Sequence, residues 1–115
     1  MTAYKHEIDH IKTYTAKIMQ AIPETMRAFY ALSQSSSTPG ALDTKTKELI
    51  ALANGVTAHC KGCIAFHTRG ALQAGASPAE IMEALGVAIA MGGGPALMYA
   101  SYAVEAMEEL QNRTE

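Results

Sequence analysis

The spacing of apolar residues predicts helices along nearly the whole chain. Strand-like alternation is absent, and Ala, Met, Leu and Glu, which favour helices, are frequent. Two proline-containing segments mark helix starts: Pro23, and Ser77-Pro78-Ala79-Glu80, a capping box with proline at the first helical position. The predicted helices cover residues 3–21, 23–33, 43 or 44 to 58, 60–74, 78–91 and 95–110.

The segments between these helices are short. Residues 35–40 form a polar loop rich in Ser, Pro and Gly, Gly75 is placed to stop a helix, and residues 92–95 form a glycine turn. No linker, repeat or low-complexity tract divides the chain. We therefore expect an all-α fold of about six helices, with antiparallel neighbours, in one compact domain spanning residues 1–115.

One stretch has the length and composition of a membrane span. Residues 84–104 contain no charged side chain and are numerous enough to cross a bilayer. Glycines at 92–94 followed by Pro95 interrupt this stretch and are expected to break a helix there. The interpretation is two buried helices joined by a tight turn, with no membrane contact.

Composition narrows the choice of partners and compartment. Hydrophobic residues make up 49% of the chain and charged residues only 17%, which predicts a subunit interface and hence a homo-oligomer. The net charge of −2 and the absence of a basic run argue against nucleic acid. The N-terminus is charged early and lacks an apolar signal core, so we expect a cytoplasmic protein.

Two cysteines, Cys60 and Cys63, stand three residues apart and carry the chemistry of the chain. Such a pair in a chain with no export signal is typical of catalysis or metal binding. On a helical wheel the two cysteines share one stripe with Ile64 and His67. A helix that only packs a core would more often carry Leu or Ile on that stripe.

The spacing suits dithiol chemistry. Thiols three residues apart on a helix are neighbours that can form a disulfide, and a position in the first turn favours the thiolate. His67 lies one turn beyond Cys63, close enough to exchange a proton with it or with bound water. A thiolate that attacks a peroxide O–O bond becomes a sulfenic acid, and a second thiol condenses with it to a disulfide. Glu48, at the edge of an apolar helix face, and His59, beside Cys60, are weaker candidates.

Three functions remain open on these residues. The first is reduction of organic hydroperoxides or hydrogen peroxide by a dithiol cycle. The second is general thiol–disulfide exchange or redox sensing with protein partners. The third is a metal-binding module, because Cys60, Cys63, His67 and Glu48 number four ligands of the types that zinc prefers. The peroxidase is the favoured interpretation, and it requires neither a metal nor a cofactor.

The segment from residue 44 to 102 resembles a known family. Glu48, eleven intervening residues and the run 60–67 (CKGCIAFH) look like the signature of the alkylhydroperoxidase (AhpD-like) branch of the carboxymuconolactone decarboxylase superfamily. The segments 71–77 (ALQAGAS) and 92–96 (GGGPA) are also similar to that family. The resemblance implies an all-α unit that assembles into trimers or hexamers.

The resemblance also implies roles for individual residues. Cys63 would attack the peroxide, Cys60 would be proton donor and resolving thiol, and Glu48 and His67 would form a proton relay through water. Electrons would come from a dithiol donor such as a lipoyl adaptor. Some family members carry a histidine between the two cysteines, where this chain has Gly62.

A histidine stands instead at position 59, which makes His59 a candidate accessory residue. Superfamily members that decarboxylate a lactone generally lack the pair of cysteines. The resemblance therefore argues against lactone chemistry.

Overall fold

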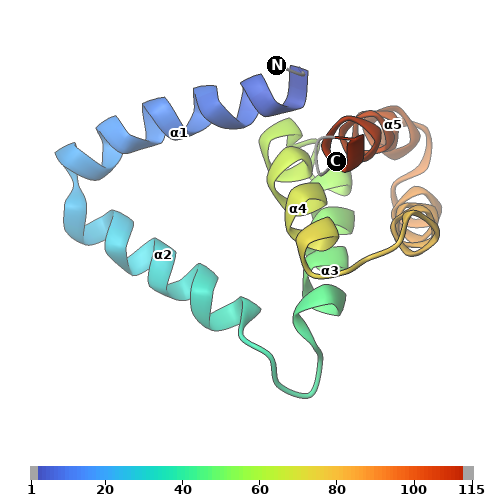
Figure 1. Ribbon diagram of the computed structural model, residues 1–115, viewed down its shortest axis with the longest axis horizontal. Coiled ribbons are helices and arrows are strands. Elements are labelled where there is room, and N and C mark those ends of the chain that lie inside the picture. The colour runs from blue at the N-terminus through green and yellow to red at the C-terminus, as the bar shows by residue number, and fades with distance from the viewer. Residues whose placement is uncertain (1–2, 113–115) are drawn as a thin grey trace.

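The computed structural model describes residues 3–112, and its regular elements over that range are all helices (Figure 1). The all-α fold class is confirmed, with five helices in place of about six. Their bounds are α1 Ala3–Ala21, α2 Pro23–Ser37, α3 Thr44–Thr57, α4 Lys61–Gln73 and α5 Pro78–Asn112.

The glycine run is the reason for the lower count. α5 includes both predicted C-terminal helices, and Gly93 alone adopts a non-helical conformation inside it, with φ 71° and ψ −152°. Glycine accepts this positive φ without steric cost, so the chain turns within a single residue. Figure 1 shows the two parts of α5 as separate coils, both seen end-on.

Most helix ends lie where local signals predict them. Asp43 caps α3 by accepting a hydrogen bond from the Thr46 backbone N–H at 2.8 Å. Ser77 and Glu80 form the predicted capping box, each side chain accepting a hydrogen bond from the other residue's backbone N–H. Gly75, with φ 95°, ends α4 in the left-handed conformation.

α2 is longer than predicted. It continues to Ser37, so the predicted loop over residues 35–40 begins only at Thr38. Ser36 and Ser37 donate their hydroxyls to the Ser33 carbonyl, at 2.9 and 3.0 Å. These bonds satisfy the hydroxyls within the helix, which lets serines that usually favour turns extend α2 by one turn.

The main core lies between α3, α4 and α5. Its fully buried side chains include Leu52 and Val56 from α3, Ile64 from α4 and Ile81 from α5. The small residues of the second part of α5 pack against them: Ala96, Ala100 and Ala103. These three helices therefore form the body of the fold.

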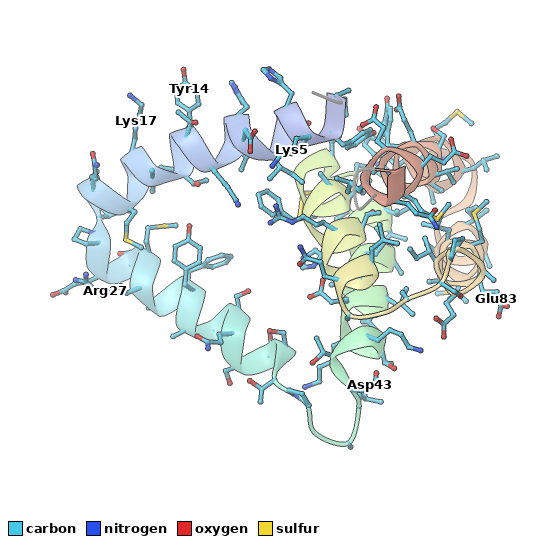
Figure 2. All side chains as sticks on the ribbon, viewed as in Figure 1. Lys5, Tyr14, Lys17, Arg27, Asp43 and Glu83 are labelled. Carbon is cyan, nitrogen blue, oxygen red and sulfur yellow. A yellow bond between two sulfur atoms is a disulfide. The ribbon has the colours of Figure 1, made fainter. Side chains whose placement is uncertain are left out.

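α1 and α2, here called the arm, stand away from this body (Figure 1). The N-terminal end of α1 is attached through Tyr4 and Ile8, which pack in a second apolar cluster with Ala65 of α4 and Leu110 of α5. α2 buries none of its residues. The side chains of Tyr14 and Lys17 point outward from the arm in Figure 2.

α5 is long and apolar enough to cross a membrane by length and composition. The segment Pro78–Gln111 has a mean hydropathy of 1.5 over its most apolar window, of which 22% is buried in the fold. Gly93 interrupts it near the middle. Because only 22% of its apolar window is buried, large apolar side chains of α5 remain exposed, including Val87, Met91 and Met98.

Candidate functional site

Three residues, Ala58, His59 and Cys60, separate α3 from the cysteine helix α4, and His59 is the middle one. Its φ is 57°, the left-handed conformation that glycine more often supplies after a helix. The His59 N–H donates to the Val56 carbonyl at 3.2 Å, and the Cys60 N–H donates to the Gly55 carbonyl at 2.9 Å. This is the Schellman pattern, and it turns the chain so sharply that the next residue already caps α4.

Cys60 is that cap. Its backbone is extended, and its Sγ accepts a hydrogen bond from the Cys63 backbone N–H at 3.1 Å. A disulfide joins Cys60 to Cys63, whose Cα atoms are 5.2 Å apart. The structure thus places both sulfurs at the N-terminus of α4, where unpaired N–H groups and the helix dipole stabilise a thiolate once the bond is reduced.

The predicted stripe of α4 has two parts. Ile64 and Ala71 are fully buried in the main core. Cys60, Cys63 and His67 are partly exposed and line a cleft. The stripe therefore anchors the helix through its apolar members and presents its reactive members at the edge of the core.

His67 and Glu48 meet across the contact between α4 and α3. The imidazole Nδ1 lies 3.1 Å from the Glu48 Oε2, and the two side chains are 35% and 16% exposed. A neutral imidazole that donates its Nδ1–H to this carboxylate keeps Nε2 free to accept a proton. Four of the five predicted site residues, Cys60, Cys63, His67 and Glu48, are thus brought to one region of the fold.

The cleft beside the disulfide has a volume of about 560 Å³ and is bounded by the arm. α1 supplies Ile11, and α2 supplies Met26, Phe29 and Tyr30, while Phe66 comes from α4 itself. The walls are mostly apolar. Their polar side chains are Lys12, Thr15 and Ser33 on the arm and His67 beside the disulfide. The apolar arm residues of the cleft were not predicted as site residues, and their apolar character in the first two helices was the available signal.

Gly55 was also missed. It is buried in α3, and a Cβ built on it would lie 3.0 Å from the Cys63 Cβ, tighter than ordinary packing. The absence of a side chain lets α3 approach the cysteine helix at Cys63. A lone glycine inside a predicted helix was the signal for it.

The fifth predicted residue, His59, is directed elsewhere. Its ring stacks on Tyr99 of α5, with centroids 4.6 Å apart and planes 12° from parallel. It does not line the cleft. The structure gives His59 a backbone role at the α3–α4 junction, and an accessory part in proton transfer stays a prediction.

The structure does not favour the metal-binding interpretation. Within residues 3–112, no three His, Cys, Asp or Glu side chains are grouped so that they could hold a metal ion. In the oxidised state described here, Cys60 and Cys63 are joined to each other, so their sulfurs are not thiolate ligands.

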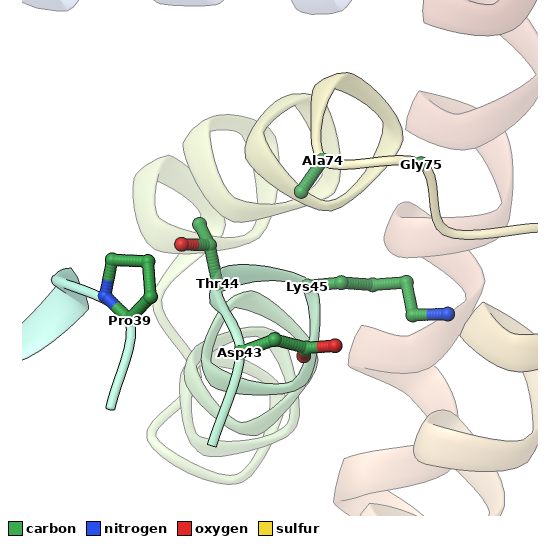
Figure 3. A pocket seen from close by; sticks show the side chains of 6 residues that line it. All are labelled: Pro39, Asp43, Thr44, Lys45, Ala74 and Gly75. Carbon is green, nitrogen blue, oxygen red and sulfur yellow. The ribbon is translucent and has the colours of Figure 1, made fainter. Parts of the chain in front are cut away.

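A second hollow of about 460 Å³ lies at the N-terminus of α3 (Figure 3). It contains Asp43, Lys45 and the turn after α4 at Gly75. Hydrogen bonds from the side chain and backbone of Thr46 lower the pKa of Asp43, so this carboxylate is engaged as a helix cap. The residues that line this hollow include no cysteine or histidine.

Comparison with solved structures agrees with this description. A carboxymuconolactone decarboxylase family protein from Legionella pneumophila superimposes with a TM-score of 0.91 at 47% identity, over 93% of this chain and 96% of that one. A Thermotoga maritima protein of the same family, named in connection with an antioxidative response, gives a TM-score of 0.74 at 37% identity. That match covers 78% of this chain and 93% of the Thermotoga chain.

Sequence comparison gives the same result. An uncharacterized protein of Cupriavidus necator is 37% identical over 109 residues, which cover 95% of this chain and 96% of the relative. The profile of the carboxymuconolactone decarboxylase family matches residues 23–106, which include α2 to α4 and most of α5. The chain therefore belongs to the carboxymuconolactone decarboxylase family, as the resemblance of its cysteine segment implies.

Proposed function

We propose that the protein is a thiol-dependent peroxidase that reduces organic hydroperoxides through the Cys60–Cys63 pair. The observation that carries the proposal is the position of the disulfide, which lies in an apolar cleft that also contains His67. The antioxidative context named for the Thermotoga relative agrees with it. An enzyme of this kind needs no bound cofactor.

The chemistry can be written with its atoms balanced. The Cys63 thiolate attacks one oxygen of ROOH, the O–O bond breaks, and the departing RO⁻ takes a proton to leave as ROH, giving Cys63–SOH. The Cys60 sulfur then attacks Cys63, and the hydroxyl leaves as water, which gives the disulfide. A dithiol donor, such as a lipoyl adaptor, reduces the disulfide and is itself oxidised to a disulfide.

The pair of His67 and Glu48 supplies a route for the protons. With Nδ1–H held by the Glu48 carboxylate, Nε2 can take the proton of Cys63 through water and return it to the departing oxygen. The i, i+4 spacing places His67 one turn from Cys63 rather than from Cys60, which supports Cys63 as the attacking thiol. Cys60, which can close a disulfide with Cys63, is the resolving thiol, and the family resemblance also gives it the role of proton donor.

The cleft supports an organic substrate. A hydroperoxide with an apolar group would place that group against Phe29, Tyr30 and Phe66 while its O–O bond reaches the sulfur. The dithiol cycle also requires a reducing compartment, which supports the cytoplasm.

A homo-oligomer is the second part of the proposal. Apolar side chains are exposed on two separated surfaces: Leu32 of α2 is 66% exposed and Met91 of α5 is 81% exposed. A second copy of the chain would cover such surfaces, and the family resemblance implies a trimer or hexamer. Sedimentation velocity is expected to show an oligomer that Met91→Glu weakens, and a wild-type monomer at micromolar concentration would contradict the proposal.

The decisive test is the free-thiol count and intact mass after one equivalent of cumene hydroperoxide, followed in time. We expect rapid loss of both thiols to an internal disulfide, and their return on addition of a dithiol. Cys63→Ser is expected to abolish turnover, while Cys60→Ser leaves a sulfenic acid that dimedone traps. Full activity in Cys63→Ser would overturn the assignment of the attacking thiol.

General thiol–disulfide exchange is the second candidate, and one observation favours it. Cys60 caps α4 with its sulfur on a backbone N–H, a position that lowers thiol pKa values in exchange proteins. If the thiols survive the hydroperoxide but are oxidised rapidly by a disulfide-bonded protein substrate, exchange replaces peroxide reduction as the function.

A further inference from the structure

Gly70 lies in the interior of α4, three residues after His67 and on the same face. Nothing in its backbone requires glycine. Among the described residues, the glycines with positive φ are Gly75 and Gly93, so Gly70 has a conformation open to any residue. Glycine is also among the poorest helix formers. The reason for a glycine at this position therefore lies in the space beside it.

That space is occupied by Glu48. A Cβ built on Gly70 would overlap the carboxylate oxygen Oε2 and lie 2.7 Å from the Glu48 Cδ. The displaced oxygen is the same Oε2 that faces the His67 Nδ1 at 3.1 Å. The carboxylate thus reaches His67 across the surface of α4 over Gly70, where no side chain is in its way.

We propose that Gly70 is the positioning residue of the Glu48–His67 pair. Its missing Cβ provides the place in which the carboxylate lies when it accepts the His67 Nδ1–H. Gly70 touches neither sulfur nor substrate in this assignment and acts through Glu48 alone. The inference about turnover rests on the proposed peroxidase function, whereas the inference about the imidazole does not.

The consequence is a separation of stability from function. The clash of an added methyl involves the far end of a flexible side chain, which can swing away at little cost to the fold. When the Glu48 side chain swings away, its carboxylate no longer accepts the hydrogen bond from the His67 Nδ1–H. Gly70→Ala is therefore expected to keep or raise the melting temperature, because alanine favours the helix, and to disable the pair.

The matched control is Gly86→Ala in α5. Gly86 also lies inside a helix, is exposed where Gly70 is half-buried, and a Cβ built on it meets no atom within 4 Å. It brings the same gain in helix propensity without a displaced carboxylate. Glu48→Ala, alone and combined with Gly70→Ala, completes a double-mutant cycle.

The experiment makes two measurements on the chain of 115 residues. The first is the ¹⁵N–¹H spectrum of the His67 ring, in which the wild type and Gly86→Ala are expected to show the Nδ1–H tautomer. Gly70→Ala is expected to show a mixture of tautomers, as is Glu48→Ala. This measurement keeps its meaning even if the protein is not a peroxidase.

The second is the rate of Cys63 oxidation by cumene hydroperoxide. Gly70→Ala is expected to lose about tenfold or more, part of the roughly 10²–10⁴-fold that general acid–base catalysis contributes, and to add no further loss to Glu48→Ala. A wild-type ring spectrum in Gly70→Ala, or losses that add in the double variant, would overturn the proposal. If Gly70→Ala fails to fold, the double variant, which lacks the overlap, must fold, and its failure would also overturn the proposal.

Discussion

Reduction of the Cys60–Cys63 disulfide is expected to leave the protein folded and to lower its stability by about 2 kcal/mol at most. The disulfide closes a loop with a sequence separation of three. The chain-entropy relation for so small a loop gives about 2 kcal/mol at 25 °C. Neither cysteine belongs to the main core, where Leu52, Val56 and Ile64 hold α3 and α4 together. The packing of the cysteine helix therefore does not depend on the bond.

A local interaction reduces the loss further. The Cys60 sulfur accepts the Cys63 backbone N–H, and a thiolate accepts such a bond more strongly than a disulfide sulfur. In a domain slightly above 100 residues, 2 kcal/mol corresponds to a fall in melting temperature of about 8 °C. We therefore expect circular dichroism melts with and without a dithiol to differ by that amount or less.

The matched control is the double variant Cys60→Ser/Cys63→Ser. It lacks the disulfide but retains a good helix cap, since serine is favoured at that position. Its melting temperature is expected to equal that of the reduced protein and to be unchanged by addition of a dithiol. Loss of helical signal on reduction, or a fall well beyond 8 °C, would refute the reasoning and make the disulfide a structural bond.

Three further predictions concern acid stability, the cleft and the core. Hydrogen bonds from Lys45 and Ser77 lower the pKa of Glu80 from 4.5, so its contribution is present above that pH and is lost as pH falls through the lowered pKa. Acid titrations of unfolding should therefore show a smaller loss below pH 4.5 in Glu80→Gln. Phe29→Ala should lower the ratio of kcat/KM for cumene hydroperoxide to kcat/KM for hydrogen peroxide about tenfold, because an apolar contact with the substrate is lost. Leu32→Ala, which changes a residue outside the cleft, should leave this ratio unchanged. Leu52→Ala should cost about 2–5 kcal/mol in urea unfolding, and a smaller change would mean that the core can collapse around it.

The parts of the fold predicted from sequence are those encoded by neighbouring residues. The Asp43 cap, the Ser77–Glu80 box and the Gly75 stop each depend on atoms within one turn, and each lies where it was expected. α2 exceeded its predicted end because serine hydroxyls can bond backward to the helix as well as forward to a turn. Whether a serine hydroxyl bonds backward to the helix or forward to a turn depends on small differences in local energy, which the pattern of residue types does not contain.

The position of the arm could not be predicted. Residues such as Phe29 and Leu32 have the apolar character of core positions, and sequence alone gives no reason to leave them outside it. In the structure they are 58% and 66% exposed, and α2 buries nothing. An apolar helix face predicts burial against some partner, but it does not say whether that partner is the same chain, a substrate or a second subunit.

The site shows a similar division between what one helix encodes and what two helices create together. Cys60, Cys63 and His67 share a stripe of one helix, so spacing alone brought them together. The partnership of His67 with Glu48 joins residues nineteen positions apart, and only the resemblance to a family raised Glu48 above the level of a boundary residue. The glycines at 55 and 70 are the hardest to detect, because their contribution is space that a neighbouring helix occupies. A sequence pattern records which side chains are present, whereas the approach of α3 to α4 depends on side chains that are missing.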